Sequence, residues 1–100
     1  MSAPDDGRRA DAVAATTRSL EAIAADGRAG IWISRVDPHL ALARAAAVDR
    51  RVARGEHLPL AGTTLAVKDN IDVADRVTTA ACPAFAFEPA ADAPAVRALT

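Results

Sequence analysis

The sequence predicts a chain in which helices alternate with short strands, and three observations support this expectation. Apolar side chains recur with helical spacing after Asp11. Residues 30–34 and 63–67 are two short runs rich in β-branched and large apolar side chains, which is typical of strands. Pro38 and Pro94 each follow an Asp closely, a combination that favours the start of a helix. Helix and strand signals are therefore both present.

Composition limits what such a chain can do. Its 100 residues carry a formal net charge of -1, which does not favour nucleic acid or an anionic membrane surface as a partner. Ala makes up more than half of the hydrophobic residues and buries little surface, so we do not expect a stable, complete domain. Cys82 is the single cysteine, and no run of residues resembles a signal peptide or a membrane span. A cytoplasmic protein is the simplest expectation.

The first predicted helix begins near Asp11, after a polar stretch of residues 1–10 that we expect to be frayed. One face of this helix would carry Val13, Thr17, Leu20, Ile23 and Ala24. Gly27 supplies a stop signal. This amphipathic pattern predicts packing against another part of the protein, rather than recognition of a separate partner.

The run of residues 30–34 places Ile31 and Ile33 on one face and Trp32 on the other if it is extended. We expect Trp32 to be a core side chain. The second predicted helix begins with Asp37 as N-cap and Pro38 in the first helical position.

That second helix continues to Gly55. Its C-terminal half collects four arginines, Arg44, Arg50, Arg51 and Arg54, where cations suit the helix dipole. A solvated basic face is the preferred interpretation, with a docking patch as the alternative. His39 and His57 lack metal-ligand spacing and are expected at the surface or at helix ends.

Lys68 is the only lysine among 12 basic residues, and it follows the apolar run of residues 63–67, predicted to be a buried strand. An arginine stays charged in proteins, whereas a lysine amine that leaves water loses its proton readily and can then act as a base. Lys68 is therefore the first candidate catalytic residue, the alternative being a solvated residue at a strand end. The neighbouring Asp69 could orient the amine or, more commonly for an Asp in a turn, accept from a backbone N–H.

The segment after Lys68 does not predict a metal site. Asp69, Asp72 and Asp75 are spaced by three, whereas a calcium loop needs acids at alternate positions followed by Gly. Cys82 has no neighbouring His and no second Cys, so we expect it to pack as a small apolar residue. Asp92 predicts the N-cap of a last helix that has no stop signal before Thr100, and we expect the chain to be part of a longer one.

Three segments carry a family resemblance. Residues 59–62 (PLAG), 66–73 (AVKDNIDV) and 78–85 (TTAACPAF) together resemble the amidase signature family. The last of these segments, with residues 31–33 upstream, is most similar to the allophanate hydrolase branch. The resemblance is clear over residues 58–99. It therefore divides the chain into an N-terminal helical segment, residues 1–57, and the truncated start of an amidase signature domain, residues 58–100.

The resemblance implies an α/β fold, a mixed sheet surrounded by helices, to which this chain contributes two N-terminal helices and a Lys-bearing strand. It also implies amide hydrolysis by a nucleophilic Ser, a second Ser on a cis peptide and a Lys, without a cofactor. Lys68 matches that Lys. The implied reaction is hydrolysis of allophanate in urea degradation, with a small amide as substrate, no nucleic acid or membrane partner, and a homodimer as the assembly to consider for the full-length protein.

Two positions depart from the family pattern. Thr64 stands where Pro is usual and should loosen the strand entry, and Asp75 stands where Gly is usual and should keep the loop from a positive φ. The Gly-Ser-rich segment that brings both serines has no counterpart among Ser2, Ser19 and Ser34, so we expect the chain alone to be inactive. Two alternatives stay open: an amidase signature enzyme for aryl, aliphatic or glutaminyl amides, and a short helical binding module without activity.

Overall fold

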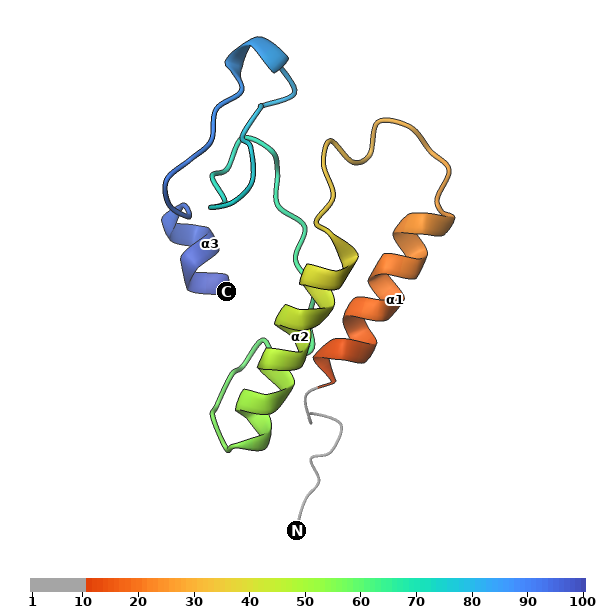
Figure 1. The fold of residues 1–100 in the computed structure, drawn as a ribbon, viewed down its shortest axis with the longest axis vertical. Coiled ribbons are helices and arrows are strands. Elements are labelled where there is room, and N and C mark those ends of the chain that lie inside the picture. Colours follow the sequence, from red (N-terminus) through yellow and green to blue (C-terminus); the bar gives the residue numbers. More distant parts are fainter. Residues whose placement is uncertain (1–10) are drawn as a thin grey trace. The chain divides into compact units, whose positions relative to one another are not determined.

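The computed structural model describes residues 11–100, so the fraying expected for residues 1–10 lies outside the described part. The elements in chain order are α1 (Ala12–Ala25), α2 (Pro38–Ala53), the short 3-10 helix η2 (Pro83–Phe85) and α3 (Pro94–Leu99) (Figure 1). The three helices predicted from the sequence are therefore confirmed. The chain forms two compact units, Met1–Thr64 and Leu65–Thr100, which we describe separately.

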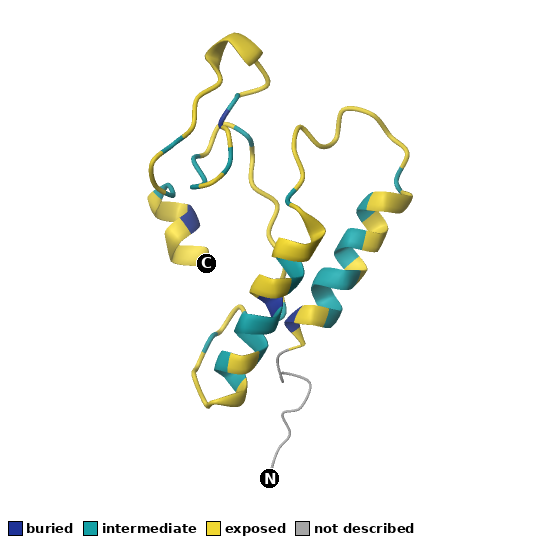
Figure 2. Ribbon diagram, viewed as in Figure 1, coloured by how far each residue is buried: buried dark blue, intermediate teal, exposed yellow. Residues whose placement is uncertain are grey.

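In the first unit, α1 and α2 pack against each other through small side chains. Ala12 and Ala45 are their buried residues, and most other positions on both helices remain partly or fully exposed (Figure 2). Alanine lets two helices approach closely but removes little apolar surface from water. The packing of this pair therefore depends on polar contacts as well.

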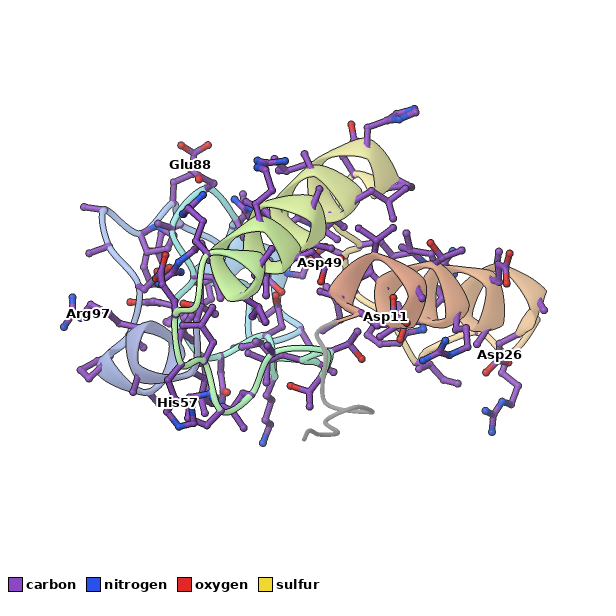
Figure 3. The ribbon with its side chains drawn as sticks, turned by 90° about the horizontal axis from the view of Figure 1, so that it is seen from below. Asp11, Asp26, Asp49, His57, Glu88 and Arg97 are labelled. Atoms are coloured by element: carbon purple, nitrogen blue, oxygen red, sulfur yellow. The ribbon has the colours of Figure 1, made fainter. Side chains whose placement is uncertain are left out.

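The start of α1 is capped from α2. Asp11 is the N-cap residue but makes no side-chain cap hydrogen bond. Instead, the two carboxylate oxygens of Asp49 accept from the backbone amides of Ala12 at 2.7 Å and Val13 at 3.1 Å. Figure 3 shows Asp49 beside the first turn of α1. A carboxylate there satisfies amides that have no partner within the helix and suits its dipole, so Asp49 links the two helices.

The predicted start of α2 is confirmed, and its end at Ala53 lies close to the predicted stop at Gly55. The Asp37 carboxylate accepts from the amide of His39 at 2.8 Å, and Pro38 takes the first position. Beyond the C-terminus, Glu56 binds Arg51 at 2.9 Å and Arg54 at 3.2 Å. The hydrogen bond from Arg51 lowers the pKa of Glu56.

The two predicted strands are wrong for the described residues. Residues 30–34 and 63–67 contain no strand, and Leu65 is 50% exposed, so the Lys-bearing segment is neither extended in a sheet nor buried. Trp32 is 38% exposed and is not a core residue. A strand needs a neighbour for its backbone hydrogen bonds. Within residues 11–100, the one bridge formed is the antiparallel pair Thr78 and Phe87, and no sheet is present.

In the second unit, turns precede α3 and the buried residues are Thr78 and Val96. Asp92 does not cap α3 as predicted; its carboxylate accepts from the amide of Ala74 at 2.7 Å, and the N-cap is Ala93. In the described part of the chain, no helix combines the length and apolar character needed to cross a membrane. The division of the sequence at residues 57 and 58 stays a prediction.

Candidate active site

Lys68 lies at the first position of a tight turn in the second unit. Its carbonyl accepts from the amide of Ile71 at 3.0 Å, which closes the turn over residues 68–71. The side chain is exposed, as are those of Leu65 and Val67 before it. The donor of this hydrogen bond, Ile71, follows Lys68 in the chain.

Asp69, the next residue, is bound twice to the segment that begins at Thr79. Its carboxylate accepts from the backbone amide of Thr79 at 3.0 Å and from the Thr79 hydroxyl. Its carbonyl accepts from the amides of Thr79 at 3.2 Å and Ala80 at 3.1 Å. Of the two roles expected for Asp69, the hydrogen bond to a backbone N–H is confirmed. We refer to these contacts of Asp69 with Thr79 and Ala80 as the Asp69 clamp.

A strained turn follows the clamp. The amide of Cys82 donates to the carbonyl of Thr79 at 2.9 Å, and the two residues between them, Ala80 and Ala81, have φ values of 53° and 62°. Positive φ at both central positions is the geometry of a type I′ turn, which normally uses Gly or Asn. Alanine disfavours positive φ because of its Cβ, so contacts with neighbouring residues must stabilise this turn.

Asp72 forms the second set of contacts in this loop. Its carboxylate accepts from the hydroxyl of the buried Thr78 at 2.9 Å, and its carbonyl accepts from the amide of Ala93 at 2.8 Å. Asp92 closes the same region through the amide of Ala74. Carboxylates in this loop are thus used to fix its backbone.

Asp75 corrects a further expectation. It has a φ of 72°, so the replacement of the usual Gly does not keep this position from the left-handed region. Asp tolerates that region better than most residues because its short polar side chain can bond locally.

Hydroxyl groups near Lys68 already have partners. Residues 65–100 contain no serine, and the hydroxyls of Thr78 and Thr79 donate to Asp72 and Asp69. Ser19 belongs to the first unit, where its hydroxyl lies 3.1 Å from that of Thr64. Within residues 65–100 the structure therefore holds the backbone of Lys68 in place, and this unit contains no serine.

Cys82 is exposed, so its predicted packing as a small apolar residue is wrong. His39 and His57 are exposed, as expected, with His39 in the first turn of α2. Among the described residues, no group of three or more His, Cys, Asp or Glu could hold a metal ion.

Comparison with known proteins decides the family. Residues 14–100 match the family described as Amidase. The chain belongs to the amidase family. Among curated relatives of this amidase chain, urea amidolyase from Saccharomyces cerevisiae is 59% identical over 44 residues, which is 44% of the chain and 2% of the yeast protein. Urea amidolyase from Lachancea kluyveri is 46% identical over 68 residues, or 68% of the chain and 4% of the relative.

A third relative carries the name of an amidase: AmiB2 of Mycobacterium tuberculosis is 38% identical over 77 residues, which is 67% of the chain and 17% of AmiB2. The chain thus spans only a small part of the length of each of these relatives.

The sequence indicated Lys68 and Asp69 as site residues but not the partner of Asp69. The adjacent Thr78 and Thr79 could have indicated this partner, because each threonine hydroxyl can donate a hydrogen bond to one acid of the preceding loop.

Proposed function

We propose that this chain is the N-terminal portion of an amide hydrolase and that Lys68 is its catalytic base. The observation that carries the proposal is the family match over residues 14–100. The assignment of Lys68 is supported by the resemblance of residues 66–73 to the family pattern, and the Lys68 carbonyl closes a turn with the amide of Ile71. A lysine can serve as a base only when it is neutral. In this proposal the rest of the domain supplies the cover that keeps water from the amine.

The proposed mechanism uses a triad of two serines and Lys68. Lys68 accepts a proton through the Ser on the cis peptide, and this proton comes from the nucleophilic Ser as it attacks the amide carbonyl. Both serines would come from a Gly-Ser-rich segment outside these 100 residues, so the chain alone would be inactive and no cofactor is required. For the complete domain we propose an α/β fold, in which helices surround a mixed sheet.

Allophanate is the proposed substrate. Support comes from the two urea amidolyase relatives, 59% and 46% identical over their matched segments. A cytoplasmic location and a homodimer of the full-length protein belong to the same proposal. A second candidate substrate class, other small amides, is favoured by the 38% identity with AmiB2. Activity of the complete protein on aryl, aliphatic or glutaminyl amides, without activity on allophanate, would select that second class.

The decisive experiment measures ammonia release by the complete protein with Lys68 replaced. Lys68→Ala should lower kcat by about 100-fold or more, the usual contribution of a general base. Arg97→Ala is the matched control because it removes another exposed cation from the same unit, and it should retain full activity. Full activity of Lys68→Ala would remove the basis for the proposed role of Lys68.

The coding sequence beyond Thr100 tests the class of protein. A Gly-Ser-rich segment should follow within some tens of residues, and its absence would contradict the hydrolase proposal. A stop codon after Thr100, together with cooperative unfolding of the 100-residue chain, would instead favour a helical binding module.

A further inference from the structure

We infer that Asp69 and Thr79 are positioning residues for Lys68, acting through the Asp69 clamp on the backbone that carries the lysine. The inference rests on the proposed function, since it assigns a role in the same reaction. Neither residue contacts the reacting atoms in this assignment. Both act by fixing the place from which the Lys68 side chain leaves the backbone.

Asp69 uses more than one group to bind the segment that begins at Thr79. Its carboxylate and its carbonyl both accept from Thr79, and the carbonyl also accepts from Ala80. A turn Asp that only satisfied one amide would need a single oxygen. Because both ends of the residue bind the same short segment, rotation about the backbone bonds of Asp69 would break several hydrogen bonds at once.

The Asp69 clamp begins at the residue directly after the lysine. Adjacent Cα atoms are about 3.8 Å apart, so the Lys68 Cα cannot move far while Asp69 is held. The carbonyl between the two residues is itself bound to the amide of Ile71. The Lys68 side chain is long and flexible, and the direction of its first bond is therefore the part of its position that the backbone can control.

The backbone on the other side of the clamp is strained. Ala80 and Ala81 hold positive φ values without Gly. Strained backbone persists where surrounding contacts over-determine it, and it is concentrated at functional sites. The Ala80 amide donates to Asp69, so the clamp holds one end of the strained turn in place.

An alternative role for Asp69 is electrostatic, since Asp69 is a carboxylate residue directly next to Lys68 in the chain. Asp69→Asn separates the two roles. The amide oxygen of Asn can still accept from the Thr79 amide and hydroxyl, while the charge is lost. Positioning predicts that Asn largely preserves activity, whereas an electrostatic role predicts that Asn is as harmful as Ala.

The test uses the complete protein and compares kcat and KM for ammonia release. Displacement of a catalytic group by about 1 Å can cost on the order of 100-fold in rate. We expect Asp69→Ala to lower kcat by about 10-fold to 100-fold with KM nearly unchanged, because Lys68 acts in the chemical step rather than in substrate binding. Asp69→Asn should recover most of this loss, and Thr79→Val, which keeps the backbone amide, should cause a smaller loss than Asp69→Ala.

The double variant Asp69→Ala/Thr79→Val should be little slower than Asp69→Ala, since the hydroxyl of Thr79 then loses only its remaining contact, with the Ala81 amide at 3.1 Å. Glu88→Ala is the matched control, an exposed carboxylate of the same unit (Figure 3), and should leave both parameters unchanged. All rates are normalised to folded protein measured by circular dichroism; if Asp69→Ala does not fold, Thr79→Val and Asp69→Asn carry the comparison.

The inference is overturned if Asp69→Ala matches Glu88→Ala, if Asp69→Asn is as slow as Asp69→Ala, or if Thr79→Val leaves kcat unchanged. Failure of the inference is distinguishable from failure of the proposed function. An inactive Lys68→Ala beside a fully active Asp69→Ala rejects positioning alone. A fully active Lys68→Ala rejects the proposed role of Lys68 as catalytic base.

Discussion

The side chain of Asp69 accepts hydrogen bonds from both the backbone amide and the hydroxyl of Thr79, ten residues further along the chain. Hydrogen bonds to a charged acceptor are stronger than neutral ones. This contact therefore closes the loop that follows Lys68 with charge-assisted hydrogen bonds, which offset part of the entropy cost of closing the loop. The backbone around the candidate base is held by side chains from its own loop, in a unit whose buried core is small.

Replacing Asp92 should loosen this loop from its other end. Asp92→Ala leaves the Ala74 amide without its 2.7 Å partner, which should cost about 1–3 kcal/mol in a partly buried site. Hydrogen exchange of the complete protein should show faster exchange at Ala74, with the turn of residues 68–71 also affected. Asp92→Asn keeps an acceptor oxygen and is the control. Unchanged exchange at Ala74 in Asp92→Ala would contradict the assigned contact.

Replacing Ala80 with Gly should stabilise the protein. A left-handed conformation costs a residue with a Cβ roughly 1–2 kcal/mol, and Gly loses about 0.5–1 kcal/mol more entropy on folding, so the net gain is up to about 1.5 kcal/mol. Chemical denaturation of the complete protein measures this gain. Ala22→Gly in the interior of α1 is the matched control and should destabilise by about 1 kcal/mol. Equal destabilisation by both changes would show that Ala80 is not strained.

Removing the carboxylate of Asp49 should weaken the start of α1. Asp49→Ala leaves the amides of Ala12 and Val13 unsatisfied, and the loss of such a cap typically costs about 1–2 kcal/mol. Asp11→Ala should cost much less, because Asp11 makes no side-chain cap hydrogen bond. Amide exchange in the first turn of α1 and the free energy of unfolding provide the measurement. A larger effect at Asp11 than at Asp49 would reverse this assignment.

The elements that could be predicted from the sequence are those specified by local contacts. The helix that begins at Asp37 and Pro38 is one, since its cap bond spans only two residues. Asp92 also precedes a proline closely and was predicted to be an N-cap. Its carboxylate instead accepts from the amide of Ala74, 18 residues away, and no local sequence pattern indicates such a distant partner. The predicted strands fail for a related reason, because a strand requires a partner and the described residues provide none for residues 63–67.

The candidate site was predictable to the same extent. Lys68 stood out as the single lysine, and Asp69 was expected to bind a backbone amide. The sequence did not indicate which amide, since the partner depends on the course of the loop between Asp69 and Thr79. That loop includes a positive φ at Asp75, and Ala80 directly after Thr79 has another; such a conformation is uncommon for residues other than Gly.

Acid should loosen the C-terminal end of α2 through Glu56. Its pKa is lowered chiefly by the hydrogen bond from Arg51, so the folded state binds this proton less readily than the unfolded chain. The contribution of Glu56 to stability is therefore fully present above the pKa of an unfolded Glu, about 4.3, and is lost as pH falls through the lower folded value. We expect faster amide exchange, relative to the intrinsic rate, at Arg54 and Gly55 in this range. Glu56→Gln should abolish the pH dependence, and added salt should reduce it because the pair is exposed. A pH dependence that persists in Glu56→Gln would assign the effect to another group.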